Sequence, residues 1–222
     1  MTNILKIESG THFSQVYILG PGQNSEVPEK ITLEADSSVN IVIIILPGVS
    51  CYLPITVDLK GRGADANISG VYLCGSDEHV KIDVELTHKV PDCTSHQLFK
   101  GIAAGSSHFD FYGKIIVVQD AQKTEAYQEN HNILLTETAK VDTKPQLEIY
   151  ADDVKCTHGA TIGRLNEDEQ FYMRSRGISE ADALVLQMIS FTAPVFDHIE
   201  DNAQREEMRT LYEDAIRSLT AK

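Results

Sequence analysis

Residues 147–178 read LEIYADDVKCTHGATIGRLNEDEQFYMRSRGI, and within them the pattern of the chain changes from strand to helix. Up to about Gly163 the residues form short β-type pieces, whereas those that follow predict amphipathic helix. Cys156 and His158 lie two residues apart in the last β-type piece. Side chains alternate along a strand, so both are expected on one face. The sequence therefore places a thiol and an imidazole side by side where a sheet ends and helices begin.

The same β-type pattern extends back to about residue 31. Many of the pieces alternate between apolar and charged residues, as KIDVEL does at residues 81–86, and turn glycines separate them. This pattern predicts an all-β body, and the close spacing of the strands is compatible with a sandwich, a barrel or a β-solenoid. Repeats of fixed period are absent, so periodicity by itself does not choose among the three.

Three helices are predicted after this body. Asn166 is a suitable N-cap, with Glu169 three residues on, and Gly177 is a suitable left-handed stop. Ser179 is expected to begin a second helix, which Pro194 should kink or end. A third is expected over residues 202–219, with an apolar seam at Met208, Leu211, Tyr212, Ala215, Ile216 and Leu219.

Composition and charge exclude several classes of partner. The formal net charge is -14 and the lysines and arginines are scattered, which argues against nucleic acid and against anionic membrane surfaces. No secretory leader is recognisable, and the most apolar stretch, residues 39–46, is too short to span a bilayer. The four cysteines form no CxxC pair, so we expect reduced thiols in a cytoplasmic protein.

Motifs of common enzymes are missing. The chain has no GxxxxGK[ST], no GxSxG and no HExxH, so it is not expected to hydrolyse ATP itself. The acidic residues Asp142, Glu148, Asp152 and Asp153 raise the alternative of a polysaccharide-active enzyme with paired carboxylates. Such enzymes are usually secreted and stack sugars on aromatic rings, yet aromatics are 7% of this chain and tryptophan is absent. A solvated acidic turn is the favoured interpretation.

The remaining histidines show no metal-binding spacing. They include His79, His88, His96, His108 and His131, and most are expected to face solvent or cap turns. Ligands contributed by neighbouring turns of a solenoid would escape an analysis of spacing. Cys156 and His158 together offer only two ligands, so the residues alone favour a hydrogen-bonded histidine that caps the last strand.

Several motifs resemble one known family. They are the Cys156-x-His158-Gly-Ala-Thr sequence, the residues 84–101 (VELTHKVPDCTSHQLFKG), most of residues 113–163, and FYMRSRGIS at 171–179. Together they resemble the SufB/SufD family of the SUF iron–sulfur cluster assembly system, over about residues 71–195. His-Gly-Ala-Thr favours the SufD branch, because the SufB branch typically has His-Glu-Ala-Thr at this point.

The resemblance implies a right-handed parallel β-helix in residues 1–164 and a C-terminal helical region in residues 165–222. It implies a non-enzymatic scaffold that dimerises through its β-helix, with a SufB-like subunit or with itself. The helical region would bind a SufC-type ABC ATPase in a SufBCD complex. No cofactor would be bound tightly, and iron or an iron–sulfur cluster would be held transiently at a subunit interface.

The resemblance also implies two groups of site residues. His158 and, after it, Cys156 would act as ligand or relay for iron or a nascent cluster at the dimer interface. The residues expected in or beside the ATPase-docking helices are Phe171, Tyr172, Arg174, Arg176 and Gly177. Arg174 and Arg176 are two residues apart, so they cannot both face one side of a helix.

Members of this family are usually longer, with an N-terminal helical region and more β-helix turns, so a short form or a C-terminal part is expected here. Three alternatives to the SufD-like scaffold stay open. They are a SufB-like direct cluster scaffold, a self-pairing structural homodimer without cluster chemistry, and a polysaccharide-active β-helix enzyme.

Overall fold

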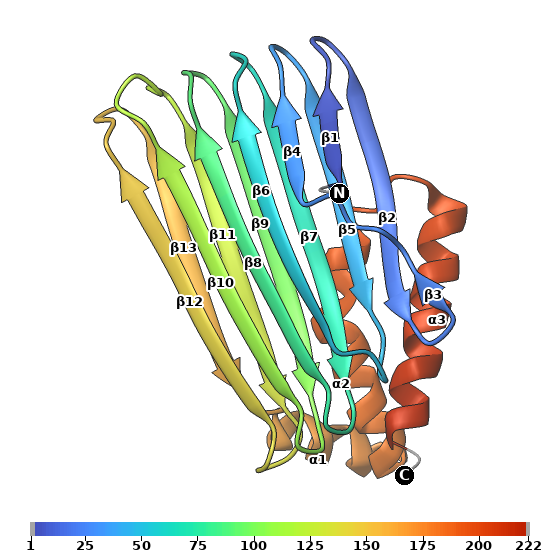
Figure 1. The fold of residues 1–222 in the computed structure, drawn as a ribbon. Helices are drawn as coiled ribbons and strands as arrows, with labels where there is room; N and C mark the ends of the chain where they lie inside the picture. The colour runs from blue at the N-terminus through green and yellow to red at the C-terminus, as the bar shows by residue number, and fades with distance from the viewer. Residues whose placement is uncertain (1–2, 221–222) are drawn as a thin grey trace.

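The computed structural model describes residues 3–220. The ends of the two predicted regions, residues 1–2 and 221–222, lie outside the described residues. A body of strands precedes three helices (Figure 1). The strands are β1 (Ile4–Ile7), β2 (His12–Gly20), β3 (Gln23–Asn24), β4 (Lys30–Leu33), β5 (Ser38–Ile45), β6 (Cys51–Leu59), β7 (Asp65–Cys74), β8 (His79–His88), β9 (Thr94–Ala103), β10 (His108–Val117), β11 (Glu125–Leu134), β12 (Lys140–Ile149) and β13 (Lys155–Gly163).

The strands form two sheets that face one another. The first sheet has the order β1-β4-β6-β8-β10-β12, and the second has the order β13-β11-β9-β7-β5-β2-β3. Successive turns of the chain add one strand to each sheet in parallel, and among the strands of residues 3–220 only β3 runs antiparallel, against β2. The body is therefore a parallel β-solenoid of about six turns, which confirms the predicted fold class and excludes the sandwich and the barrel.

The core lies between the sheets and follows the alternation of the strands. In β8 every second residue from Val80 to Leu86 is buried, as the alternating sequence predicts. Aromatic rings stack along the core: the ring centroids of Tyr72 and Phe109 are 3.5 Å apart. The β structure also begins earlier than residue 31, because β1, β2 and β3 form a first turn on which β4 and β5 stack.

The helices begin and end where the sequence predicts. Helix α1 spans Glu167–Ser175, α2 spans Glu180–Phe196 and α3 spans Asn202–Thr220. The Asn166 side chain accepts hydrogen bonds from the backbone N–H groups of Asp168 and Glu169, and Ser179 caps α2 in the same way. Gly177 has a φ of 87°, the left-handed stop. Pro194 lies in the last turn of α2, which ends two residues later.

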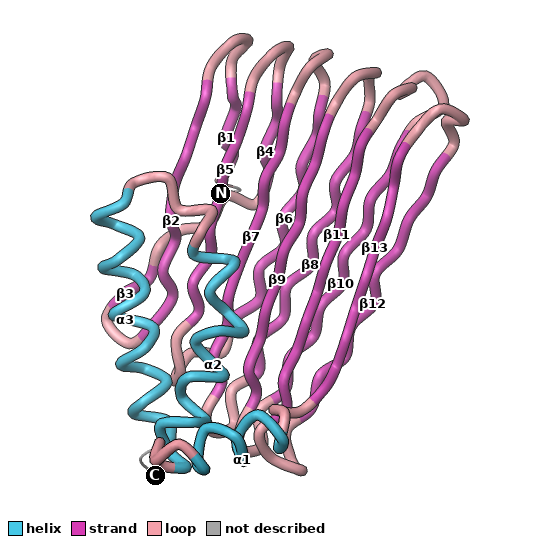
Figure 2. Tube along the Cα trace, turned by 180° about the vertical axis from the view of Figure 1, so that it is seen from behind, coloured by secondary structure: helices cyan, strands magenta, loops and turns pink. Residues whose placement is uncertain are grey.

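Helices α2 and α3 cover part of the outer face of the second sheet (Figure 2). Met188, Tyr212 and Ile216 are buried there against apolar residues of β5, β7 and β9, such as Ile44 and Leu73. The outer face of the first sheet and the edge strands β12 and β13 carry no helix (Figure 1). The helices are therefore fixed to the early turns of the second sheet, and the last turn is left uncovered.

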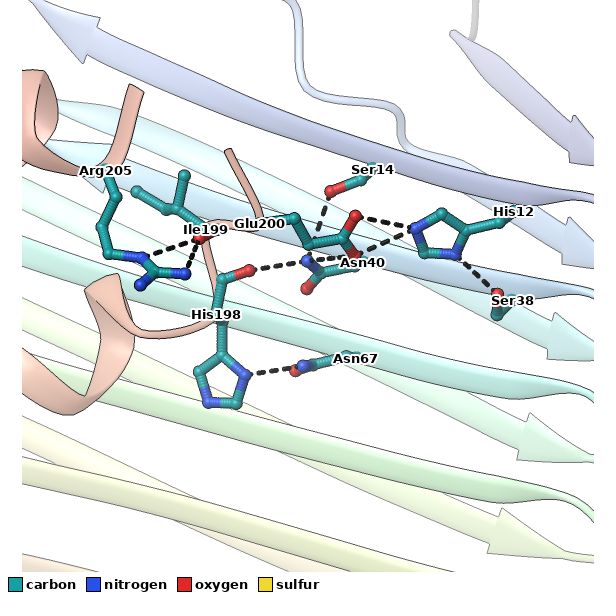
Figure 3. Close-up of polar contacts among 9 residues, drawn as sticks. All are labelled: His12, Ser14, Ser38, Asn40, Asn67, His198, Ile199, Glu200 and Arg205. Carbon is teal, nitrogen blue, oxygen red and sulfur yellow. Dashed lines mark hydrogen bonds and ion pairs between the residues drawn. The ribbon is translucent and has the colours of Figure 1, made fainter. Parts of the chain in front are cut away.

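The loop between α2 and α3 is held on the second sheet by side chains (Figure 3). The Asn40 amide donates to the His198 carbonyl at 2.7 Å, and the Asn67 amide lies 2.7 Å from His198 Nδ1. His12 Nε2 lies 2.9 Å from a Glu200 carboxylate oxygen. Contacts from three neighbouring strands thus fix the position of the helical hairpin.

Candidate functional site

The last turn of the solenoid consists of β12, β13 and the residues between them, and we call it the terminal turn. Cys156 pairs in register with Ala126 of β11, and His158 pairs with Gln128. Ala126 and Gln128 are buried in the core. Cys156 and His158 therefore face the interior side of the solenoid, on one face of β13 as the alternation predicts. No further turn covers them among the described residues, so His158 is exposed and Cys156 half-buried.

Polar side chains line the core next to His158. Gln128 Nε2 donates to Gln97 Oε1 at 2.9 Å, so the two amides stack from one turn to the next. Gln128 lies against Gly113 of the opposite sheet, where a Cβ atom would collide with its amide. Gln128 Oε1 and Thr143 Oγ1 are buried without a hydrogen-bond partner among the described residues. A polar column therefore leads through the core to the imidazole of the terminal turn.

Cys156 is a protonated thiol in this environment. Partial burial raises its pKa, and a backbone hydrogen bond involving Ala126 offsets the effect only in part. A thiolate is the form that binds metal, so Cys156 by itself is not activated for that role. A cluster usually takes four protein ligands, and Cys156 and His158 supply two. The pair fits an iron or cluster site only if further ligands come from another chain.

The other cysteines lie elsewhere in the core. Burial raises the pKa of Cys51 to about 11 and that of Cys74 to about 12. Cys93 is buried and its pKa is raised as well, for the same reason. All four cysteines are free thiols in the part of the chain that the structure describes. Cys156 is the one that lies on the terminal turn.

The terminal turn also exposes large apolar side chains. Ile149, Tyr150 and Ile162 are 40%, 61% and 46% exposed. The edge strands β12 and β13 have 10 and 9 residues. Long, uncovered edge strands with apolar side chains tend to pair with another chain. The terminal turn thus has the properties of an interface.

The four acidic residues singled out in the sequence, Asp142, Glu148, Asp152 and Asp153, do not converge on one point. Asp142 lies near the start of β12, where His108 contacts it, and Glu148 lies near its end, where Lys114 contacts it at 3.0 Å. Six residues of strand separate the two by roughly 20 Å. Asp152 and Asp153 lie in the connection to β13. These positions support the interpretation of a solvated surface.

Helix α1 carries a second exposed apolar surface. Phe171 and Tyr172 are 74% and 59% exposed, and no residue of α1, all of which is described, is buried. The Arg176 guanidinium lies 5.2 Å from the centre of the Tyr172 ring, while Arg174 lies 3.8 Å from Glu180. A groove beside them is lined by apolar side chains of β11, α1, α2 and the loop before α1, among them Ile133, Leu165, Tyr172, Met173, Leu186 and Phe191.

The histidines have varied environments. His88 is fully buried next to Ser95, and burial lowers its pKa to about 4, so it is neutral at pH 7. His96 stacks on Tyr127. His79 and His108, which showed no metal-binding spacing in the sequence, lie side by side on neighbouring turns. The only sequence signal for this pair is a separation of 29 residues, the distance from β8 to the same position in β10.

Residues 6–191 match the sequence profile described as "SUF system FeS cluster assembly, SufBD core domain". The chain belongs to the SufBD family. It is 38% identical over 153 residues to the iron–sulfur cluster assembly protein SufD of Escherichia coli, an alignment that covers 69% of this chain and 36% of that protein. It is 44% identical over 124 residues to an iron–sulfur cluster assembly SufBD family protein of Synechocystis, covering 56% of this chain and 26% of that protein.

A third relative is the chloroplastic protein ABCI7 of Arabidopsis thaliana, 32% identical over 177 residues that cover 79% of this chain and 37% of ABCI7. The chain spans less than half the length of each of these relatives. The match to the SufBD profile includes the solenoid, the terminal turn, α1 and most of α2. Among the described residues, no helix is both long and apolar enough to cross a membrane.

Proposed function

We propose that this chain is a non-catalytic, SufD-like scaffold component of the SUF iron–sulfur cluster assembly machinery. It pairs through the terminal turn of its β-solenoid with a SufB-like subunit or a second copy of itself, and it binds a SufC-type ABC ATPase through its C-terminal helices. The observation that carries the proposal is the uncovered terminal turn, which exposes apolar side chains together with the inward-facing His158 and Cys156.

The terminal turn suits pairing because its exposed groups are those of a solenoid core. A second solenoid end placed on it would bury Ile149 and Ile162 and would continue the parallel sheets. Pairing would also place His158 and Cys156 in an enclosed site between the two chains. The partner would then supply the ligands that this chain lacks for iron or a cluster, which are the cargo of the site.

Helix α1 suits the binding of an ATPase because its aromatic residues contribute little to the core. Exposed aromatic and arginine side chains are the residue types that dominate protein interfaces. Phe171, Tyr172 and Arg176 provide such a group at the start of the helical region, and Gly177 turns the chain there towards α2. Arg174 is paired with Glu180 and belongs to the edge of this surface.

The alternatives differ in what the terminal turn must hold. A direct, SufB-like cluster scaffold needs a thiolate set, whereas the cysteines of this chain lie apart and three of them are on earlier turns. A polysaccharide-active enzyme needs a carboxylate pair in a groove, which Asp142 and Glu148 do not form. The SufD-like role requires one histidine and one cysteine at an interface.

Light scattering after size exclusion tests the two surfaces separately. The chain is mixed with the SufC-type ATPase and the SufB-like protein of the same organism. Ile162→Glu is expected to abolish pairing of the scaffold and retain ATPase binding, because it puts a charge on the inward face of β13, where the partner is expected to pack. The matched variant Leu186→Glu, on α2, is expected to do the reverse. If neither variant changes any complex, both assigned surfaces are wrong.

His158→Ala is expected to leave the melting temperature unchanged, because the exposed imidazole opens no cavity when it is removed. The same variant is expected to lower the activity of iron–sulfur enzymes in cells that depend on this chain, by about tenfold or more for a lost ligand. His96→Ala, on an exposed histidine of the same sheet, is the control. Normal enzyme activity in the His158→Ala strain would contradict the site.

A further inference from the structure

Two imidazoles and a carboxylate converge on the outer face of the first sheet, away from the interior-facing His158. His79 and His108 are the first residues of β8 and β10 and pair in register. Their rings are parallel within 7° and their centroids are 4.8 Å apart, which is the spacing of neighbouring strands. Asp110 lies two residues further along β10 on the same face. Each side chain is therefore positioned by a paired strand rather than by a loop.

The ligand atoms of these residues point at one another. His79 Nε2 lies 2.6 Å from Asp110 Oδ2, and His108 Nε2 lies 3.4 Å from Asp110 Oδ1. One ligand atom from each of the three residues lies within 4.8 Å of the other two. Asp142, in register with Asp110 on the next strand, has an oxygen 2.8 Å from His108 Nε2. Three successive turns thus contribute two nitrogens and two carboxylates to one place.

We propose that His79, His108, Asp110 and Asp142 bind a divalent first-row transition metal ion of the Zn²⁺ or Fe²⁺ type. Imidazole nitrogen favours such ions, and two imidazoles with one carboxylate are a common ligand set for them. Small movements of the side chains would bring the ligand atoms of His79, His108 and Asp110 to metal-binding distance, which is about 2.0–2.2 Å for nitrogen and oxygen on zinc, and Asp142 is the fourth ligand through its place beside His108. Two carboxylates also balance the charge of the ion.

The neighbouring cation does not neutralise these carboxylates. Lys81, the register partner of Asp110, forms its ion pair with Asp83 instead, at 3.2 Å, and its ammonium group lies over the Tyr52 ring. The described residues place only imidazoles within ion-pair distance of Asp110 and Asp142. Lys81 and Lys144 line the same hollow as the two carboxylates, but neither lysine forms an ion pair with Asp110 or Asp142 among the described residues. The His79 side chain is 54% exposed, so an ion can enter from solvent.

The proposal does not depend on the SUF role. The ligands lie on the outer face of β8, β10 and β12, whereas Cys156 and His158 lie on the inner face of β13. Variants can therefore separate the two sites. Cys156→Ser and His158→Ala should leave this metal site intact, and His79→Gln should leave His158 unchanged.

Calorimetric titration of the full chain with Zn²⁺ tests the site. The wild type and the Cys156→Ser, His158→Ala double variant are each expected to bind one ion at it. His79→Gln and Asp110→Asn are each expected to weaken that binding by about 100-fold or more. Loss of a residue that only supports a ligand already costs about 10- to 100-fold in metal affinity, and these variants remove a ligand itself. His96→Gln, a substitution of another exposed strand histidine, is the matched control and should bind as the wild type does.

Absorption spectra with Co²⁺ give a second measurement. Visible d–d bands of the bound ion are expected in the wild type and should be lost in His108→Gln, while the melting temperature of the metal-free chain stays the same. Equal Zn²⁺ affinity in the wild type, His79→Gln and Asp110→Asn would overturn the site. Binding of Mg²⁺ as tight as that of Zn²⁺ would overturn the role of the imidazoles, because Mg²⁺ prefers oxygen ligands.

Discussion

Replacing Gly101 with alanine is expected to lower the free energy of unfolding by about 3 kcal/mol, the upper end of the usual cost of overpacking. Gly101 lies in β9, and a Cβ atom there would collide with the ring of Tyr72 on β7. That ring is fully buried and cannot move aside, because it stacks on Phe109 and its hydroxyl group donates a hydrogen bond to Asn132. The midpoint of urea unfolding, followed by circular dichroism, measures the effect.

Two further variants identify the cause of this loss. Gly163→Ala is the control, because no atom lies within 4 Å of the Cβ position there and its unfolding midpoint should not change. Tyr72→Ala removes the ring that collides, so the cost of Gly101→Ala should be smaller in that background than in the wild type. If Gly101→Ala and Gly163→Ala have the same unfolding midpoint, the Tyr72 ring does not pack against Gly101 of β9 as described.

Local signals in the sequence predict local structure well in this chain. The alternation at residues 81–86 predicts strand β8, and Asn166, Gly177 and Ser179 predict the ends of α1 and the start of α2. Each of these signals acts through neighbouring residues, by side-chain alternation or by capping of free backbone groups. For the same reason, the shared face of Cys156 and His158 follows from their spacing alone.

The stacking of the turns could not be predicted from periodicity, because the turns differ in length. Lys30 pairs with Thr56, 26 residues on, whereas His108 pairs with Lys140, 32 residues on. The connections between the strands absorb the difference, so no fixed repeat remains in the sequence. The resemblance to a family, rather than the pattern of residues, led to the prediction of a solenoid.

The cluster around His79 and His108 was missed for this reason. Its residues come from three turns, and their separations depend on the length of each connection. Only knowledge of the register shows that Asp110 and Asp142 lie beside the two rings. The residue pattern did not predict the exposure of Phe171 and Tyr172 either, because an apolar position on a helix has the same sequence signature whether it faces a core or a partner; only the family resemblance placed them at a docking surface.

Replacing both Phe171 and Tyr172 with alanine is expected to abolish measurable binding of the SufC-type ATPase. This expectation rests on the proposed function. Truncation of an aromatic side chain at the centre of an interface costs about 2 kcal/mol or more. Two such losses weaken binding by roughly three orders of magnitude, since 1.4 kcal/mol corresponds to a factor of ten. Surface plasmon resonance with immobilised ATPase measures the change.

The stability of the double variant separates docking from packing. A buried aromatic side chain costs about 3–5 kcal/mol when truncated, whereas Phe171 is 74% exposed, so the urea midpoint should stay close to that of the wild type. Tyr52→Ala, a truncation of another exposed aromatic on the outer face of the first sheet, is the matched control and should retain ATPase binding. A double variant that binds the ATPase normally would remove α1 from the interface. A double variant that loses several kcal/mol of stability would instead make these rings part of the core, and its loss of binding would then follow from unfolding of the helical region.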